Sequence, residues 1–480
     1  MSTKPLNVVI LAAGKGTRMY SMLPKVLHQL AGKPLLQHVI DSAKSLQPKK
    51  MIVVYGYGGD TVPKAFAHED IIWANQAEQL GTGHALQQAM PHLDTDATTL
   101  ILLGDVPLVN AESCQALLDE TLTLGLMSFK KPDPTGYGRI VRNSSGIVMS
   151  IVEHKDANEQ QRQINEVNTG IIAADNKHLT SWLSRLTNHN AQGEYYLTDI
   201  VAMAAQDVNR AVAEISDDES SDESWLENEN TAHIVTTHIV NDEWEVAGVN
   251  SKQDLAQLER IYQTRNAEKL LKAGVTLRDP SRLDVRGELT VGQDVEIDIG
   301  CIFEGKVNLA DGVKIGAHCV IKDSSIGTGT VVAPFTHMEQ VTIADECRIG
   351  PYARLRPGTE LNSDTHIGNF VELKNAQVDV GSKINHLSYV GDTTVGKAVN
   401  IGAGTITCNY DGANKFRTVI GDNAFIGSDS QLVAPVTIGE GATIGAGSTI
   451  TKDAPANQLT ISRGRQTSIS GWKRPQKIKK

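Results

Sequence analysis

Residues 420–450 read IGDNAFIGSDSQLVAPVTIGEGATIGAGSTI, and an aliphatic residue returns at every sixth position, from Ile420 through Ile426 to Ile450. Less complete copies of this hexad extend the pattern over about residues 290–450. A period of six fits neither an amphipathic helix nor a two-sided strand. It is typical of short strands wound into a triangular coil, in which each face turns one aliphatic residue inward. The repeat therefore predicts a parallel β-helix.

The first 250 residues have a different pattern, in which apolar strands alternate with helical stretches. Buried strands are predicted at Asn7–Ala12, Met51–Tyr55 and Thr99–Leu103. This alternation predicts a Rossmann-like α/β sheet, whose ligands bind beyond the carboxyl ends of the strands. Helical spacing in 251–272 predicts one long helix that stops near Gly274. We therefore divide the chain into an α/β domain over 1–252, a linker helix over 253–273 and a β-helix domain over 274–480.

Composition and charge exclude several classes of protein. The 480 residues carry a net charge of −11, which argues against a nucleic-acid-binding protein and a general membrane-surface protein. No apolar run approaches the roughly 20 residues that a membrane span needs, and the first residues lack the pattern of a secretory signal. The five scattered cysteines form no CxxC pair and indicate reduced thiols, so we expect a cytoplasmic protein.

Two charged segments stand outside these patterns. The stretch Ser216–Asn230 is dense in acids and serines, and we interpret it as a solvated surface insertion, with an acidic docking loop as the alternative. The basic tail Ser470–Lys480 is interpreted as a solvated terminus, or as a source of positive charge for a nearby phosphate site.

The first set of candidate functional residues follows the first predicted strand, where residues 11–19 read LAAGKGTRM. Glycines let a backbone approach a ligand closely and offer its N–H groups to phosphate. The spacing matches neither the GxGxxG nor the GxxxxGK[ST] motif. Asp105 ends another buried strand; such a residue is commonly a turn or cap, but beside a glycine loop it favours a Mg²⁺ ligand.

The spacing LxxGxGTRM followed by Pro24-Lys25 resembles the signature of the sugar nucleotidyltransferases, the nucleoside-diphosphate-sugar pyrophosphorylases. The resemblance implies that Mg²⁺ is held by Asp105 and Asn250. It also implies that one set of residues binds UTP and UDP-N-acetylglucosamine: Leu11, Ala12, Ala13, Gly14, Arg18, Lys25, Gln76, Gly81, Thr82, Leu103, Gly104, Asp105, Gly138, Glu153, Asn168 and Asn250. Close members of that family often have tyrosine where this chain has Leu103.

The second set of residues lies among the hexads. Arg356, Lys374 and His386 are hard to explain as scaffold, and the polar stretch Gly402–Gly412 is interpreted as a loop that leaves the coil. With these residues, nearly the whole chain resembles the family of bacterial bifunctional N-acetylglucosamine-1-phosphate uridylyltransferase/glucosamine-1-phosphate acetyltransferases. That resemblance implies a left-handed β-helix and a homotrimer, and an enzyme that supplies precursors of peptidoglycan and lipopolysaccharide.

The resemblance also implies roles for individual residues in the second half. His386 is the implied general base for transfer of acetyl from acetyl-CoA to glucosamine 1-phosphate, since a neutral imidazole accepts a proton near neutral pH. The implied sugar-phosphate ligands are Arg356, Lys374, Tyr389 and Asn400. The implied acetyl-CoA ligands are Ala403, Asn409, Tyr410, Ser428, Ala446 and Arg463.

Two other hypotheses about the function of the chain stay open at this point. The first is a nucleotidyltransferase with one activity, whose coil only assembles the oligomer or senses a regulator. The second is a binding or scaffold protein that has lost both activities. The residues Arg356, Lys374 and His386 speak against the first, and the pair Asp105 and Asn250 speaks against the second.

Overall fold

A computed structural model describes residues 4–216 and 235–477, which divide into two compact units, 1–262 and 263–480. From residue 217 on, the predicted acidic insertion lies outside the described residues, as do the last three residues of the basic tail. Within the described residues, no helix combines the length and the apolar character that crossing a membrane requires. The five cysteines are free, and four of them are buried.

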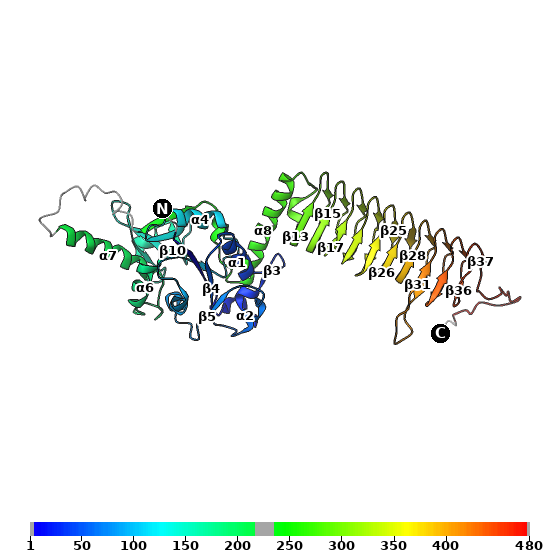
Figure 1. Cartoon of the computed structure of the whole chain (residues 1–480), viewed down its shortest axis with the longest axis horizontal. Coiled ribbons are helices and arrows are strands. Elements are labelled where there is room, and N and C mark those ends of the chain that lie inside the picture. The colour runs from blue at the N-terminus through cyan, green and yellow to red at the C-terminus, as the bar shows by residue number, and fades with distance from the viewer. Residues whose placement is uncertain (1–3, 217–234, 478–480) are drawn as a thin grey trace. The chain divides into compact units, whose positions relative to one another are not determined.

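Unit 1 is built around a mixed sheet with the strand order β11-β7-β10-β6-β1-β4-β5 (Figure 1). Strands β1, β4, β5 and β6 pair in parallel, as the alternating pattern predicts. Strand β10 pairs antiparallel with β6 and with β7, which the sequence pattern did not indicate. The elements of unit 1 are β1 (Leu6–Leu11), η1 (Thr17–Met19), η2 (Lys25–Leu27), β2 (Gln29–Leu30), β3 (Lys33–Pro34), α1 (Leu35–Ser45), β4 (Lys50–Tyr55), α2 (Thr61–Ala65), β5 (Ile72–Asn75), α3 (Thr82–Ala89), η3 (Met90–His92), β6 (Thr98–Leu103), α4 (Ala111–Glu120), β7 (Leu124–Lys130), β8 (Arg139–Arg142), β9 (Val148–Val152), α5 (Glu159–Arg162), β10 (Glu166–Asp175), α6 (Asn176–Ser184), α7 (Asp199–Ser216), β11 (Val235–Val240), η6 (Glu243–Val246) and the start of α8 (Lys252–Lys272).

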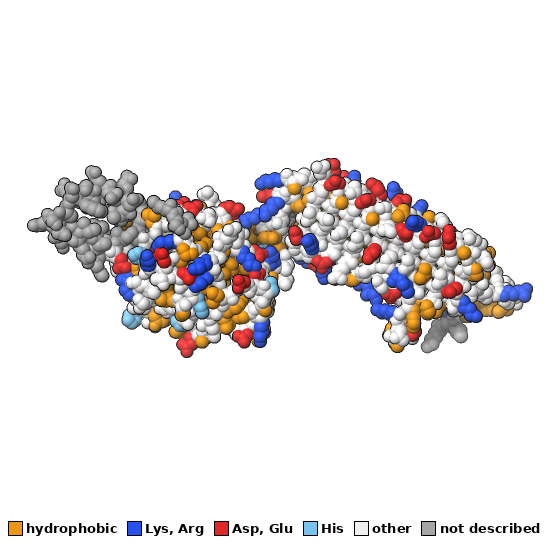
Figure 2. Space-filling model, viewed as in Figure 1, with side chains coloured by type: hydrophobic (Ala, Val, Ile, Leu, Met, Phe, Trp, Pro, Cys, Tyr) orange, Lys and Arg blue, Asp and Glu red, His pale blue; other side chains and the backbone are white. Residues whose placement is uncertain are grey.

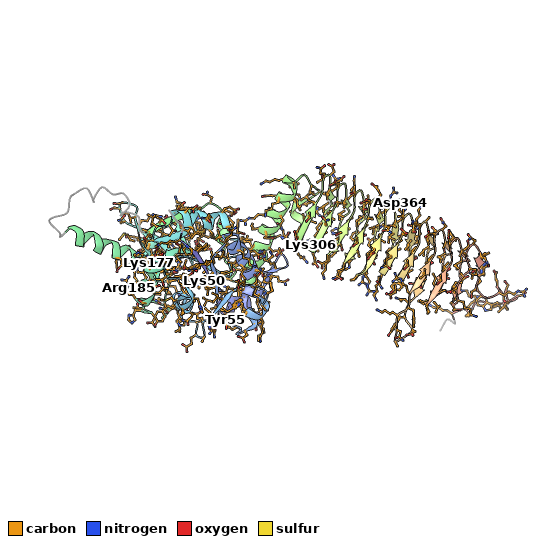
Figure 3. All side chains as sticks on the ribbon, in the orientation of Figure 1. Lys50, Tyr55, Lys177, Arg185, Lys306 and Asp364 are labelled. Atoms are coloured by element: carbon orange, nitrogen blue, oxygen red, sulfur yellow. The ribbon has the colours of Figure 1, made fainter. Side chains whose placement is uncertain are left out.

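Both faces of this sheet are buried, because successive residues of its central strands enter different apolar clusters. Val8 and Ile10 of β1 pack in one cluster, whereas Val9 packs in the other. Strand β4 behaves in the same way, and Tyr55, labelled in Figure 3, ends it. A strand buried on both sides has to be apolar throughout, which explains its continuous run of aliphatic residues. The loops after β1, β4 and β6 consequently emerge at one edge of the sheet.

Unit 2 is a parallel β-helix, which confirms the fold predicted from the hexads (Figure 1). One side of the coil is a sheet of β12 (Thr276–Leu277), β14 (Glu296–Ile297), β16 (Lys314–Ile315), β19 (Val331–Val332), β22 (Arg348–Ile349), β25 (His366–Asn369), β27 (Lys383–His386), β29 (Asn400–Ile401), β32 (Phe425–Ile426), β35 (Thr443–Ile444) and β37 (Leu459–Thr460). A second sheet covers the rest of the coil and comprises β13 (Leu283–Val291), β15 (Cys301–Leu309), β17 (Val320–Lys322), β18 (Ser325–Ile326), β20 (His337–Glu339), β21 (Val341–Ile343), β23 (Arg354–Leu355), β24 (Thr359–Leu361), β26 (Glu372–Val378), β28 (Tyr389–Val395), β30 (Ile406–Cys408), β31 (Thr418–Ile420), β33 (Gln431–Val433), β34 (Val436–Ile438) and β36 (Thr449–Ile450).

The hexad residues form the core of unit 2. Ile420, Ile426, Leu432, Ile438 and Ile444 are at most 1% exposed, and burial of an aliphatic side chain of this size contributes about 1.5–3 kcal/mol. Outward positions carry charged side chains, which dot the surface of the coil in Figure 2. The left hand of the coil stays a prediction.

Residues with positive φ mark the corners of each coil, as Leu387, Asp392 and Ala398 do in one turn. The first coil is covered by the second half of α8, where the Gln263 amide exchanges two hydrogen bonds with the backbone of Val285, at 3.0 and 2.8 Å. The linker helix predicted from the sequence is therefore present as α8, and its end protects an otherwise open strand.

The predicted loop at Gly402–Gly412 begins later than expected. Thr405 and Thr407 are buried and keep residues 402–408 in the coil, and the segment that leaves it is 409–417 (Figure 1). Their hydroxyl groups donate to the carbonyls of Gly402 and Gly391, at 2.7 and 3.1 Å. A threonine that satisfies its hydroxyl in this way can take an inward position, and this concealed the hexad in the sequence.

Candidate functional site

The loop after β1 exposes unpaired backbone donors at the edge of the sheet. Gly16 has φ 57°, and a Cβ there would come within 2.7 Å of the Lys25 Cβ, so glycine is required for the close approach of these segments. Within the described chain, the N–H groups of Ala13, Gly14 and Lys15 donate no hydrogen bond. A run of free N–H groups beside lysine side chains is a site for an anion such as a phosphate.

Two adjoining cavities open at this edge of unit 1, with volumes of about 530 and 450 Å³. Both are lined by Leu11, Thr82, Leu103 and Asp105. Among the residues predicted to bind UTP and UDP-N-acetylglucosamine, the first cavity adds Ala12, Ala13, Gly14, Lys25, Gln76 and Gly81. The second adds Arg18, Gly138, Glu153, Asn168 and Asn250. Gly104 lies in the wall behind them, where a Cβ would come within 3.1 Å of the Ala12 Cβ.

A lysine ammonium lies between the two predicted metal ligands. The Lys25 Nζ donates to Asp105 Oδ2 and, at 3.2 Å, to Asn250 Oδ1. The backbone of Asn250 is fixed by the carboxylate of Asp254 in the first turn of α8, at 2.9 Å. Two oxygens that together bind the ammonium of a lysine are also placed to bind a metal ion together. Mg²⁺ suits such a pair, because it prefers one or two protein oxygens plus phosphates and water. Within residues 4–216 and 235–477, no cluster of three or more acidic, histidine or cysteine side chains offers a cage built from protein alone.

The second cavity has a carboxyl group at its base. Glu153 is held by the Thr198 hydroxyl, which donates to its Oε1 at 3.2 Å. Burial raises the pKa of Glu153, and the negative charges of Asp156 and Asp199 add to that effect. Gly138 accepts a hydrogen bond from the Asn168 N–H at 2.9 Å, so these two predicted sugar ligands are tied to each other. A carboxyl and two peptide edges in a concave wall suit a polyhydroxylated ligand.

Leu103 lines both cavities. Gly170, with φ 82°, lies so close that a Cβ there would be 2.8 Å from the Leu103 Cδ1. The side chain of Leu103 therefore packs directly on the backbone of Gly170.

In unit 2, two of the predicted sugar-phosphate ligands, Arg356 and Lys374, lie in a cluster of charges with Glu372, Asp392 and Lys415. Arg356 donates to Glu372 at 2.9 Å. The facing amine of Lys415 lowers the pKa of Lys374; burial and the positive charge of Arg356 act in the same direction, and Asp392 opposes them. Cations forced together in this way favour an anionic ligand that separates their charges. Tyr389 is paired in register with Glu372 and so borders this cluster.

His386 lies on an exposed corner at the end of β27, opposite Asn369 of the neighbouring coil. Its Nδ1 lies 3.0 Å from the Asn369 Oδ1. An amide oxygen can only accept, so this contact fixes the proton on Nδ1 and leaves Nε2 with a lone pair. The ring is thus oriented as a base that faces solvent.

Four of the predicted acetyl-CoA ligands, Ala403, Ser428, Ala446 and Arg463, follow the same corner along successive coils. The Ala403 carbonyl accepts from the Asp429 N–H, the Ser428 carbonyl from the Gly447 N–H, and the Ala446 carbonyl from Arg463, at 2.7, 2.9 and 2.8 Å. Gly404 donates to the carbonyl of His386 at 3.3 Å, which places His386 at the head of this column. Asn400 lies on β29, three residues before Ala403. The column presents small side chains and one cation along a flat wall.

The structure does not bring all of the second set together. His386 lies at one corner of the coil, whereas Arg356, Lys374 and Asn409 lie toward the next corner, at Asp392. These corners are five residues apart, which corresponds to about 16 Å along an extended strand. Tyr410 lies in the loop 409–417 and donates to the carbonyl of Gly412 at 2.6 Å.

Three residues near these sites were missed by the sequence analysis. Lys415 is in the loop 409–417, where no repeat locates it, and Glu372 lies on an outward position of the coil two residues before Lys374, where a charged side chain is common. Asn369 precedes His386 by one coil, a spacing of 17 residues that the register of β25 and β27 would reveal. A search for polar residues one coil before the histidine would have found it.

Known protein families match both units. A MobA-like NTP transferase domain matches residues 8–129, and a bacterial transferase hexapeptide of six repeats matches residues 417–452. A relative named bifunctional protein GlmU, from Methylobacillus flagellatus, is 66% identical over 99% of this chain and 98% of its own length. Proteins of the same name from Nitrosospira multiformis and Ralstonia nicotianae are each 57% identical, over 98% and 99% of this chain and 98% and 100% of their own lengths. Since relatives more than half identical to it align over nearly their full lengths, this chain belongs to the GlmU family of bifunctional proteins.

Proposed function

We propose that the chain makes UDP-N-acetylglucosamine in two steps: it acetylates glucosamine 1-phosphate and then couples the product to UTP. The observation that carries the second step is the pair of adjoining cavities in unit 1, which meet at Leu11, Thr82, Leu103 and Asp105. The first cavity is lined by residues 13–15, whose N–H groups are free within the described part of the chain, and the second contains Glu153. A nucleotide and a sugar 1-phosphate bound side by side would meet at their shared wall.

Residues of both cavities support uridylyl transfer by positioning and charge neutralisation. The phosphate oxygen of N-acetylglucosamine 1-phosphate attacks the α-phosphorus of UTP, and pyrophosphate leaves with the electrons of the broken P–O bond. The free N–H groups of residues 13–15 hold the phosphates of UTP, and Lys25 and Arg18 offset their charge. Both reactants are anions and repel each other in solution. Binding them side by side, with the attacking oxygen in line with the bond that breaks, removes the cost of bringing them together during the reaction.

Asp105 and Asn250 would hold Mg²⁺, because their oxygens already share the Lys25 ammonium. When bound, Mg²⁺ neutralises phosphate charge and stabilises the charge that develops on the phosphate oxygens. The two cations compete for the same oxygens, so Lys25→Met should increase the affinity for Mn²⁺ in the absence of nucleotide. Electron paramagnetic resonance of free Mn²⁺ measures this, and unchanged affinity would contradict the assignment.

Unit 2 supports the acetyl transfer. His386 Nε2 takes a proton from the amine of glucosamine 1-phosphate, whose nitrogen attacks the thioester carbon of acetyl-CoA. The C–S bond breaks, and the thiolate of CoA leaves and is protonated. Arg356, Lys374 and Lys415 hold the sugar phosphate, and the column Ala403, Ser428, Ala446 and Arg463 is the wall for acetyl-CoA.

We further propose that the chain works as a homotrimer with acetyl-transfer sites between chains. An amine and a phosphate of one glucosamine 1-phosphate cannot span two corners about 16 Å apart. A neighbouring coil would bring a second corner against His386 and close the flat wall into a cleft. Sedimentation analysis at micromolar concentration tests the assembly, and a monomer that retains acetyl transfer would contradict it.

Three further assignments belong to this proposal. The uridylyltransferase domain is 1–252, the linker helix 253–273 and the acetyltransferase domain 274–480. The protein works in the cytoplasm on small-molecule substrates and supplies precursors of peptidoglycan and lipopolysaccharide.

The test of the main proposal is the full chain with glucosamine 1-phosphate, acetyl-CoA, UTP and Mg²⁺, with products identified by mass spectrometry. We expect UDP-N-acetylglucosamine, free CoA and pyrophosphate. Accumulation of N-acetylglucosamine 1-phosphate without the nucleotide sugar would refute the uridylyl step alone. Absence of CoA release would refute the acetyl step alone.

A further inference from the structure

The amide of Gln76 is held in one orientation on the wall of the first cavity. Gln76 is 3% exposed, and its backbone is fixed on both sides: the backbone N–H donates to the carbonyl of Tyr55 at 2.7 Å, and the backbone carbonyl accepts from the side-chain amide of Gln79 at 3.0 Å. Its Nε2 donates to the carbonyl of Gly81 at 3.1 Å and lies 3.1 Å from the Nδ1 of His84. The carbonyl of Gly81 can only accept, so the nitrogen of the amide has to face it.

His84 receives the second proton of that amide nitrogen. The imidazole lies in the first turn of α3, and its ring packs against Tyr195 with a centroid distance of 6.3 Å. For Nδ1 to accept from Gln76, the ring proton has to be on Nε2. If the amide turned over, its oxygen would face the Gly81 carbonyl, which can only accept, and His84 could pair with that oxygen only by moving its ring proton from Nε2 to Nδ1. Gly81 therefore sets the orientation of the amide, and His84 with its proton on Nε2 adds a second hydrogen bond that holds it there.

This orientation leaves one polar atom of the side chain for a ligand. Within the described residues, the Oε1 of Gln76 accepts no hydrogen bond, and Gln76 lines the cavity. A fixed acceptor matches a base edge that presents a ring N–H, as uracil does at N3. Cytosine presents a lone pair at N3, which an acceptor repels. An amide free to rotate would bind either base, because it could offer its donor or its acceptor.

We propose that His84 is a specificity-determining residue, which selects uracil over cytosine by locking the amide of Gln76. The inference deepens the uridylyl transfer proposed above and rests on it. His84 touches no reacting atom in this scheme and acts only through Gln76. Loss of His84 should therefore change the discrimination between nucleotides, because a site built around a hydrogen bond rejects a ligand that leaves its buried group unpaired.

The experiment compares UTP with CTP in the full-length enzyme and in variants of His84. His84→Leu removes the acceptor and keeps much of the bulk. We expect the ratio of kcat/KM for UTP to that for CTP to fall about 10-fold, the usual effect of one hydrogen bond to a buried group. His84→Asn carries an amide oxygen near the position of Nδ1 and should restore most of the ratio. His189→Leu, at an exposed position of unit 1, is the matched control and should leave the ratio unchanged.

A double variant tests whether His84 acts through Gln76. If it does, Gln76→Ala combined with His84→Leu should show the same ratio as Gln76→Ala alone, which is the signature of coupled residues. Independent effects that multiply would overturn the proposed lock, as would a His84→Leu enzyme whose ratio stays within about twofold of the unmodified protein. Acetyl transfer by unit 2 and the circular dichroism spectrum of each variant report whether the chain is folded.

Binding without turnover separates this inference from the proposed function. Calorimetric titration with UMP and with CMP measures base selection without any uridylyl transfer. If the unmodified chain releases no pyrophosphate but binds UMP more tightly than CMP in a manner that His84→Leu abolishes, the proposed reaction fails and the lock stands. Equal binding of UMP and CMP by the unmodified chain overturns the lock, whatever the activity.

Discussion

Unit 1 gathers its site within one chain, whereas unit 2 spreads its predicted site over two corners of a coil. In unit 1, loops that follow β1, β5 and β6 meet at one sheet edge and enclose two cavities. In unit 2, His386 and the Arg356–Lys374 cluster lie on one side of the coil but at its opposite corners. A sheet of parallel strands converges its loops, while a solenoid repeats its positions in columns along a surface.

The difference teaches what each architecture needs in order to make a pocket. A doubly covered sheet needs only its own loops, because they rise around the carboxyl ends of the strands. A solenoid offers rigid walls, on which residues one coil apart stay in register, as Asn369 and His386 do. A second wall has to come from elsewhere. Substitutions in the two units should therefore affect the two reactions independently, and only the second reaction should depend on assembly.

The largest expected effect is that of Asp105→Asn on uridylyl transfer. The variant removes the only charge of the predicted metal pair while it keeps the size of the side chain. We expect pyrophosphate release from UTP to fall at least about 1,000-fold, with CoA release unchanged. Asp119→Asn, at an exposed position of α4, is the control. Loss of both activities in Asp105→Asn would contradict independent sites.

His386→Ala should have the reverse pattern. We expect CoA release to fall about 100- to 1,000-fold, the contribution of a general base, and pyrophosphate release to stay unchanged. His337→Ala removes another exposed histidine of the coil and is the control. A His386→Ala protein with normal acetyl transfer would show that the base is a different group.

Mixing two inactive variants tests whether sites are shared. His386→Ala and Lys374→Met proteins, unfolded together and refolded at equal amounts, should recover about a quarter of the normal acetyl transfer if each site takes its base and its phosphate ligand from different chains. Refolding each variant alone is the control. No recovery in the mixture would place both groups of a site on the same chain.

Asn369→Ala should have a moderate effect, because it removes the partner of the His386 Nδ1 and leaves the ring itself. We expect kcat for acetyl transfer to fall about 10-fold, with little change in KM. Asn362→Ala, which removes an exposed asparagine of the same coil region, is the control. An increase in KM with kcat unchanged would show that Asn369 contacts the substrate instead.

The smallest expected effect concerns the stability of unit 1 and pH. Burial raises the pKa of Glu153, so the folded chain binds this proton more tightly than the unfolded chain. Stability should therefore fall as pH rises from the unfolded pKa, about 4.3, through the raised folded value. Glu153→Gln should remove that slope and raise Tm at neutral pH by about 1–3 °C, as measured by calorimetry. An identical pH profile in the variant would contradict the assignment.

The sequence by itself determined the features that depend on local periodicity. The hexads from Ile420 to Ile450 placed an aliphatic residue on each side of every coil, and they were enough to predict the β-helix because that burial repeats every few residues. The aliphatic runs at β1, β4 and β6 likewise predicted the parallel strands, and the loop after β1 followed from its glycines.

Only the tertiary structure decided which distant side chains meet. Some of these features leave no period in the sequence: antiparallel β10, the contact of Lys415 with Lys374, the pairing of Asn369 with His386 and the contact of His84 with Gln76. Thr405 and Thr407 even concealed a regular coil, because a hydroxyl that finds a backbone carbonyl can be buried like a methyl group. Such contacts depend on the packing of whole elements against one another, which fixes distances that spacing along the chain does not.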